Sequence, residues 1–241
     1  MLQAAPIVER AGCELWMHPN HEHMTRMAED PDAVLARRIE VARQSGVPEE
    51  PLRRYAAERR PESGIAGVVE PERDLVSGVT IETDLGAWSV HETPGHAPSH
   101  VCLYQAERRL LISGDHLLGR ISLYFDYGFT PDPVGEFMHS LELVERLNAR
   151  VCLPGHGRTF TDVRAHIEAN RKLVHERLES VLGAVREQPL TAFEIVPQVY
   201  GDALSPANVH WLLSKVLCYL THLQAVGRAQ RIPGAPERWT A

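Results

Sequence analysis

The sequence predicts an α/β protein in which short strands alternate with amphipathic helices. Three observations predict this class: period-two alternation in the middle of the chain, helical periodicity on both sides of it, and a balanced composition. The 241 residues are 44% hydrophobic and 24% charged, so the chain is long enough to bury a core without disulfides. At about 150 residues per domain, this length predicts one large domain with a smaller appendage.

The first part of the chain is predicted to be mostly helical. Apolar residues recur at helical spacing through Val34, Leu35 and Ile39, and proline or glycine interrupts the pattern at intervals. The predicted elements are a helix over residues 4–11, a strand over 13–17, helices within 21–60 that break at Pro31, Gly46 and Pro51, and a loop over 61–78.

The middle of the chain changes to strand-like alternation and then returns to long helices. Residues 79–84 and 88–92 alternate around the Leu85-Gly86 turn, which predicts a hairpin. Thr161-Asp162 supplies side-chain oxygens of the kind that cap the first turn of a helix. The remaining elements are strands over residues 100–105, 110–113 and 151–153, and helices over 133–148 and 161–187.

The end of the chain is predicted to form a separate C-terminal unit, residues 188–241, which follows a larger unit over residues 1–187. Helices over 191–200 and 205–225 precede a short strand candidate over 228–232. Helices followed by a β-hairpin are the outline of a winged helix. Because this unit carries few basic residues, a packing or dimerisation role is favoured over DNA binding.

Composition excludes several classes of protein. The net charge of −7 disfavours binding to a phosphate backbone, so nucleic acid is not expected as a partner. No membrane partner is expected either, because no apolar run approaches the roughly 18 residues that a membrane span needs. The four cysteines form no CxxC pair and are expected to be reduced thiols in a cytoplasmic protein.

One pattern occurs at three of the predicted strand ends. A glycine is followed at once by a residue of a metal-ligating type at Gly95-His96, Gly114-Asp115 and Gly155-His156. Glycine lets the backbone turn sharply and approach an ion closely, and functional groups of α/β proteins gather at strand ends. Two imidazoles and one carboxylate suit Zn²⁺, with Mn²⁺ or Fe²⁺ as alternatives. The pattern therefore predicts a metal site.

These motifs resemble those of the metallo-β-lactamase superfamily of metal-dependent hydrolases. Thr93-Pro-Gly-His96, Ser113-Gly-Asp115 and Pro154-Gly-His156-Gly157 match three of its motifs in order and spacing, and the resemblance covers residues 1–187. It implies an αββα sandwich, with a C-terminal unit similar to the winged-helix tail of the lactamase-beta-like branch. It also implies that His96 binds one metal ion, that His156 binds a second, and that Asp115 bridges both as the catalytic carboxylate.

The family's His-x-His-x-Asp-His signature does not occur in the chain. The nearest segment, His18-Pro-Asn-His21-Glu-His23, matches only its first half and is interpreted as the start of a surface helix. The segment Ala4-Ala-Pro-Ile-Val-Glu-Arg10 resembles the helix that follows the signature in the family. The expectation is an N-terminally incomplete fold that lacks the first strands of one sheet and four of the seven usual ligands.

The resemblance implies hydrolysis of an ester, thioester, lactone or phosphodiester bond by metal-activated water. The complete family site holds two zinc ions, and one or none is expected with a reduced ligand set, together with poor turnover. His100 and His116 are expected to support the ligands without binding metal themselves. Tyr124 and Tyr127, in an aromatic loop over residues 117–133, are expected to bind a small-molecule substrate.

A second class of function stays open, namely a catalytically impaired homologue that binds a partner protein. Missing strands would leave a sheet edge and an apolar surface uncovered, which favours poor solubility or a homodimer. Metal retained in stoichiometric amount would distinguish the enzyme from the partner-binding protein.

Overall fold

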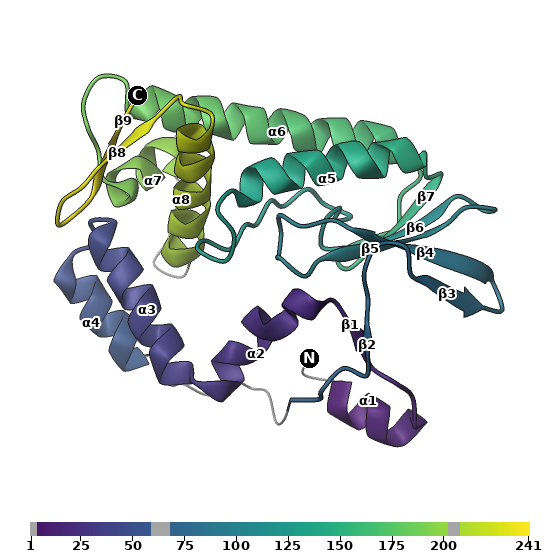
Figure 1. Ribbon diagram of the computed structural model, residues 1–241. Helices are drawn as coiled ribbons and strands as arrows, with labels where there is room; N and C mark the ends of the chain where they lie inside the picture. Colours follow the sequence, from purple (N-terminus) through teal and green to yellow (C-terminus); the bar gives the residue numbers. More distant parts are fainter. Residues whose placement is uncertain (1–3, 59–67, 202–207) are drawn as a thin grey trace. The chain divides into compact units, whose positions relative to one another are not determined.

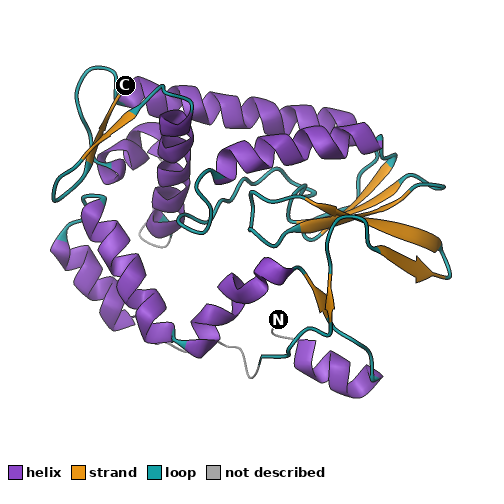
Figure 2. Ribbon diagram, in the orientation of Figure 1, coloured by secondary structure: helices purple, strands orange, loops and turns teal. Residues whose placement is uncertain are grey.

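The computed structural model describes residues 4–58, 68–201 and 208–241, and the chain forms two compact units. Unit 1 comprises Met1–Met17, His21–Arg73 and Ser180–Ala241, and unit 2 comprises His18–Asn20 and Asp74–Glu179. Helices predominate in unit 1, whereas the main sheet belongs to unit 2 (Figure 1 and Figure 2). No helix in these described ranges is long and apolar enough to cross a bilayer.

Unit 2 is built on a five-stranded sheet whose strands lie side by side in the order in which they occur in the chain. Four strands pair antiparallel, and the fifth joins the sheet in parallel. They are β3 (Thr80–Thr83), β4 (Gly86–Glu92), β5 (Val101–Gln105), β6 (Leu110–Gly114) and β7 (Val151–Pro154). Each predicted strand is confirmed to within two residues at either end, and the parallel pair β6–β7 is joined by a helical crossover.

Two helices lie over one face of this sheet (Figure 1). The crossover helix α5 (Pro133–Leu147) begins after Asp132, whose carboxylate accepts a hydrogen bond from the Gly135 N–H. The second helix, α6 (Val163–Ala184), is capped by Asp162, whose carboxylate accepts from the Ala165 N–H at 3.2 Å. The cap predicted from Thr161-Asp162 is therefore present, although the helix begins two residues later than predicted.

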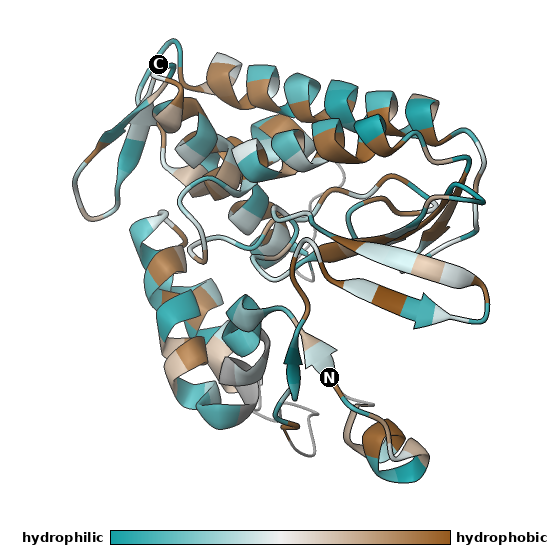
Figure 3. Ribbon diagram, turned by 45° about the vertical axis from the view of Figure 1, so that its right-hand side comes forward, coloured by the Kyte–Doolittle hydropathy of each residue, from teal (hydrophilic) through white to brown (hydrophobic). Residues whose placement is uncertain are grey.

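The core of unit 2 lies between α5, α6 and the covered face of the sheet. Cys102, Leu111 and Cys152 are fully buried there, one from each of three adjacent strands. The helices contribute buried residues at helical spacing, seen as recurring brown segments in Figure 3: Val134, Phe137, Leu141, Val144, Val163, Ile167 and Val174. Burial of these side chains away from water is the main stabilising term for the unit.

The opposite face of the sheet is also apolar. It is covered at β4, where Trp88 and Val90 are buried, and it is less covered over β5, β6 and β7. On β5, β6 and β7, the apolar residues that alternate with Cys102, Leu111 and Cys152 are Val101, Leu103, Leu110, Ile112, Val151 and Leu153. Most of them are half-buried, and Ile112 is 37% exposed. A sheet with one solvated face normally alternates apolar and polar residues, whereas apolar residues on both faces are typical of sheets covered on both sides. This second apolar face is therefore a surface suited to burial.

His18 connects the short N-terminal segment of unit 2, His18–Asn20, to strand β4 of the sheet. The buried His18 ring contacts the Glu92 carboxylate, with Nε2 2.8 Å from Oε1, and its Nδ1 accepts from the Asn20 N–H. The same carboxylate accepts from the Ser77 N–H at 3.0 Å. The hydrogen bond with His18 is the main cause of the lowered pKa of Glu92.

Unit 1 contains the helices and short strands from both ends of the chain. They are α1 (Ala4–Ala11), β1 (Trp16–Met17), α2 (Glu22–Glu29), α3 (Pro31–Gln44), α4 (Glu49–Glu58), α7 (Ala192–Tyr200), α8 (Val209–Ala225), β8 (Gln230–Ile232) and β9 (Arg238–Thr240). Two short elements, η1 (Pro19–His21) and β2 (Arg73–Asp74), have residues in both units. The predicted helix breaks at Pro31 and Gly46 are confirmed, whereas the break predicted at Pro51 is wrong, because Pro51 lies in the first turn of α4, where proline is tolerated. The predicted strand over residues 13–17 is shorter than expected. The predicted start of α8 at residue 205 lies outside the described residues.

The C-terminal elements of unit 1 are held by main-chain contacts. Thr191 and Glu194 form a capping box at the start of α7, and Phe193 donates its N–H to the Ser45 carbonyl at the end of α3. Strands β8 and β9 pair antiparallel, and Trp239 exchanges hydrogen bonds with Leu190. Two helices followed by a hairpin fit the predicted outline, while the winged-helix assignment and the division at residue 187 stay predictions.

Gly95 lies where α5 passes the end of β4. Its φ is +125°, and a Cβ there would lie 2.6 Å from the Phe137 Cα. From the same helix, Ser140 donates a hydrogen bond to the Pro94 carbonyl at 2.8 Å. The glycine of this strand end is therefore required both by its backbone conformation and by the close approach of a helix.

Gly95→Ala is expected to destabilise the protein by about 2–4 kcal/mol, because strain at positive φ adds to overpacking against α5. Gly78→Ala is the matched control, since Gly78 has a φ of +94° and nothing within 4 Å of the added Cβ. Its cost should be only the backbone strain, about 1–2 kcal/mol. Urea unfolding measures both variants, and equal losses would contradict the packing argument.

The exposed part of the second apolar face is expected to bind hydrophobic dyes and to promote self-association. Ile112→Thr should reduce both effects while changing the free energy of unfolding by less than about 1 kcal/mol. Val226→Thr is the control, because Val226 is 52% exposed and belongs to unit 1, not to the sheet of unit 2. Dye fluorescence and light scattering test this, and a monodisperse chain that binds no dye would contradict it.

Candidate metal centre

Three strand ends of unit 2 bring the predicted ligands around one carboxylate. His96 follows β4, Asp115 follows β6 and His156 follows β7. The His96 Nε2 lies 3.6 Å from Asp115 Oδ2, and the His156 Nε2 lies 3.7 Å from Asp115 Oδ1. Each carboxylate oxygen of Asp115 therefore faces a different imidazole.

The close approach of β6 and β7 places two of these residues side by side. Gly155 donates its N–H to the Gly114 carbonyl at 2.7 Å, just before His156 and Asp115 respectively. A Cβ on Gly155 would lie 2.5 Å from Asp115 Oδ1. The missing side chain of Gly155 therefore makes room for the carboxylate, which gives the glycine-before-ligand pattern its physical reason.

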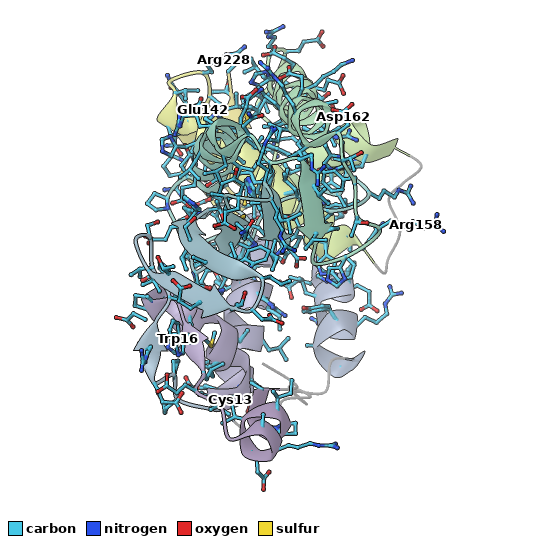
Figure 4. The ribbon with its side chains drawn as sticks, turned by 90° about the vertical axis from the view of Figure 1, so that its right-hand side faces the viewer. Cys13, Trp16, Glu142, Arg158, Asp162 and Arg228 are labelled. Carbon is cyan, nitrogen blue, oxygen red and sulfur yellow. The ribbon has the colours of Figure 1, made fainter. Side chains whose placement is uncertain are left out.

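A second contact holds the chain on the far side of His156. Gly119 donates its N–H to the His156 carbonyl at 2.9 Å. A Cβ on Gly119 would lie 2.5 Å from the main-chain nitrogen of Arg158. The exposed Arg158 side chain extends outward from this crossing (Figure 4). The main chain of His156 is thus fixed on both sides, although its side chain is 79% exposed.

The separations within the site fit ligands of a metal ion better than hydrogen-bond partners. A nitrogen–oxygen hydrogen bond spans about 2.7–3.2 Å, and both imidazole–carboxylate distances are longer. Two ligands at about 2.0–2.2 Å from one tetrahedral ion lie about 3.4 Å apart. The donor types and the pairwise spacing therefore fit zinc or a similar divalent ion.

The ligand number is smaller than a closed site requires. Within residues 4–58, 68–201 and 208–241, no three His, Cys, Asp or Glu side chains are grouped so as to hold one ion. The structure shows two imidazole–carboxylate pairs that share Asp115. The number of metal ions per chain, expected to be one or none, stays a prediction. His21 and His23, from the segment that matches only the first half of the signature, belong to unit 1 and lie at the start of α2.

The two histidines expected to support the ligands lie directly behind them. His100 is 6.0 Å from His96 between ring centroids, and the almost fully buried His116 is 6.2 Å from His100. Burial lowers the pKa of His100 to about 4, an effect that His96 strengthens and Asp115 opposes. Burial, with smaller contributions from His100 and His96, lowers the pKa of His116 to about 3. Both rings are therefore neutral at physiological pH.

The aromatic loop after β6 contributes one side chain next to the ligands. Tyr124 lies 5.6 Å from His96 between ring centroids, whereas Phe125 is fully buried and contacts Phe137 edge-on at 5.4 Å. Tyr127 is half-buried further along the same loop. Phe125 thus anchors the loop, and Tyr124 is the aromatic residue that the structure places against a predicted ligand.

A hydroxyl and two thiols beneath the ligands were not predicted as parts of the site. Thr93 is fully buried. Its Oγ1 lies 2.8 Å from His100 Nδ1 and 3.3 Å from Cys102 Sγ. Burial raises the pKa of Cys102 to about 12 and that of Cys152 to about 11, so both thiols stay protonated. The position of Thr93 at the start of the Thr-Pro-Gly-His motif is the sequence signal that could have identified it.

Comparisons with known proteins identify relatives of this chain. The chain is 33% identical over 147 residues to the protein named "Probable metallo-hydrolase YqjP" of Bacillus subtilis, covering 58% of this chain and 46% of the relative. It is 26% identical over 180 residues to the "Atrochrysone carboxyl ACP thioesterase" of Aspergillus chevalieri, covering 70% and 56% respectively. The chain thus spans about half the length of these curated relatives.

Solved structures show the same architecture. A metallo-beta-lactamase family protein of Thermus thermophilus superposes with a TM-score of 0.79 at 25% identity, covering 96% of this chain and 73% of that one. A beta-lactamase domain protein of Burkholderia ambifaria gives a TM-score of 0.70 at 28% identity, covering 79% and 59%. The sequence model of the metallo-beta-lactamase superfamily matches residues 2–156, which include all three predicted ligands. The α/β chain described above therefore belongs to the metallo-beta-lactamase superfamily.

Proposed function

We propose that the protein is a metal-dependent hydrolase that cleaves an ester or thioester bond in a small-molecule substrate. The observation that carries this proposal is Asp115 with one imidazole facing each of its carboxylate oxygens. Zinc is the proposed metal, because two imidazoles and a carboxylate are donors that it prefers. The relatives named as a metallo-hydrolase and a thioesterase support this reaction class over lactone or phosphodiester hydrolysis.

The residues of unit 2 have distinct parts in the proposed reaction. A bound divalent ion lowers the pKa of water and polarises the substrate's carbonyl oxygen. His96, Asp115 and His156 would hold the metal. The neutral rings of His100 and His116 add no positive charge behind these ligands. Tyr124, beside His96, would donate a hydrogen bond to the substrate, and Tyr127 would line the same loop.

The cysteines support a reducing cytoplasmic setting for this activity. None of the four forms a disulfide, and three of them are buried. Their protonated thiols, where the pKa is raised by burial, would not compete as nucleophiles with water.

A partner-binding role is the second candidate, and the half-covered apolar face of the sheet favours it. An apolar surface of this kind suits a protein partner or a second copy of the chain. The two candidates differ in metal content, because a partner-binding protein has no need for an intact ligand set.

Zinc loading followed by desalting is expected to leave about one zinc ion per wild-type chain. His96→Ala and Asp115→Asn should each lower this content, since each removes a ligand from an imidazole–carboxylate pair. His175→Ala is the matched control, an exposed histidine on α6 outside the centre. Elemental analysis measures the metal content, and loss of zinc in none of the ligand variants would contradict the proposed centre.

Hydrolysis of acyl thioesters by the zinc-loaded chain is the test of the reaction. Tyr124→Phe should lower kcat by about tenfold while leaving the metal content unchanged, because it removes one hydrogen-bond donor next to the ligands. Asp115→Asn should lower kcat at least about 100-fold. Thioester, ester and phosphodiester substrates are compared by steady-state kinetics. Equal activity of the Asp115→Asn variant and the wild type would reject the hydrolase proposal.

A further inference from the structure

One imidazole connects the two chain segments that carry His96 and Asp115. Main-chain hydrogen bonds hold the two ends of the loop that carries His96. The Thr93 N–H donates to the His100 carbonyl at 2.9 Å, and the His100 N–H donates to the Ala97 carbonyl at 3.1 Å. From the base of this loop, the His100 ring reaches the end of β6, where its Nε2 accepts from the Asp115 N–H at 3.0 Å. Gly114 admits the ring, because a Cβ there would lie 2.7 Å from Nε2.

The hydrogen bonds around this ring have a defined direction. A backbone N–H can only donate, so His100 Nε2 carries no proton, and the neutral ring must carry its proton on Nδ1. Nδ1–H then donates to Thr93 Oγ1 at 2.8 Å. The Thr93 hydroxyl is left to donate to Cys102 Sγ at 3.3 Å, and the Cys102 thiol donates to the Ser113 carbonyl at 3.6 Å.

These hydrogen bonds form a closed circuit that starts and ends on β6. It runs from the Asp115 N–H through His100, Thr93 and Cys102 to the carbonyl of Ser113, two residues before its origin. Thr93, Cys102 and Ser113 are fully buried, so water does not compete for these bonds. Because both ring nitrogens of His100 are engaged, neither offers a free lone pair to a metal ion.

We infer that Thr93 and His100 are positioning residues, which set the tautomer of the His100 ring and thereby hold the main chain of Asp115 at the distance from His96 that metal binding needs. This inference rests on the proposed function. Loss of the Thr93 hydroxyl leaves Nδ1–H without an acceptor and favours a proton on Nε2, where it opposes the Asp115 N–H. Asp115 would then be displaced from His96 although every ligand is still present.

The tautomer of His100 in the metal-free chain is the first measurement. Long-range proton–nitrogen NMR correlation should show Nε2 as the nitrogen without a proton in the wild type. Thr93→Val, which has nearly the same shape without the hydroxyl, should shift the proton toward Nε2, and Thr93→Ser should restore the wild-type tautomer. A proton on Nε2 in the wild type would overturn the inference, whatever the variants do.

Zinc affinity is the second measurement, made by titration with a competing chelator. Thr93→Val should weaken it about 10–100-fold, the usual effect of losing a hydrogen bond to a group behind a ligand, and Thr93→Ser should leave it near the wild type. Ser140→Ala is the structural control, because its buried hydroxyl holds the same loop through Pro94 but lies outside the circuit. It should lower the melting temperature without changing the tautomer.

The outcomes separate this inference from the proposed function. A Thr93→Val variant with the wild-type tautomer and zinc affinity, and only a lowered melting temperature like Ser140→Ala, would assign Thr93 a structural role and overturn the inference. A wild-type chain that binds no zinc would reject the proposed function. In that case the NMR tautomer and the Asp115 amide shift of Thr93→Val would still decide whether the circuit positions Asp115.

Discussion

The arrangement of the site depends on the hydrogen bond between the Gly155 N–H and the Gly114 carbonyl, 2.7 Å long. It is made at the end of the parallel pair β6–β7, one residue before Asp115 on one strand and one residue before His156 on the other. Neither position has room for a side chain, because a Cβ on Gly155 meets Asp115 and a Cβ on Gly114 meets the His100 ring. The geometry of the centre therefore depends on direct main-chain contact between the ends of β6 and β7.

Buried polar groups of unit 2 gather beneath this contact. Thr93, Ser113 and His116 are buried there, together with the thiols of Cys102 and Cys152. Hydrogen bonds compensate for burial of the two hydroxyls, since Ser113 donates to the Leu117 carbonyl at 2.7 Å while accepting from Cys152. The hydrogen bonds of these two hydroxyls restrict their side chains to one arrangement, which is what a site needs when its ligands come from separate strands.

Sequence patterns predicted much of the fold because alternation and capping are local properties. The strands of unit 2 and the Asp162 cap follow from residues that lie close together in the chain. His96, Asp115 and His156 are far apart in the chain, and they were predicted because the same glycine-before-ligand pattern occurs at three strand ends. Strand β9 was missed because it is three residues long and depends on Leu190, far away in sequence. The role of Thr93 was missed for a similar reason: its hydrogen bond to Cys102 exists only after β5 has paired with β4.

The order of the strands has a consequence for how the protein is made. Neighbouring strands of the sheet are also neighbours in the chain, so each can pair with its predecessor as synthesis proceeds, with little loop-closure entropy to overcome. His96 and Asp115 belong to successive hairpins and can meet early, whereas β7 must wait for the crossover helix α5. Assembly of the centre is therefore vectorial: a nascent chain acquires one half of it before the segment carrying His156 has left the ribosome.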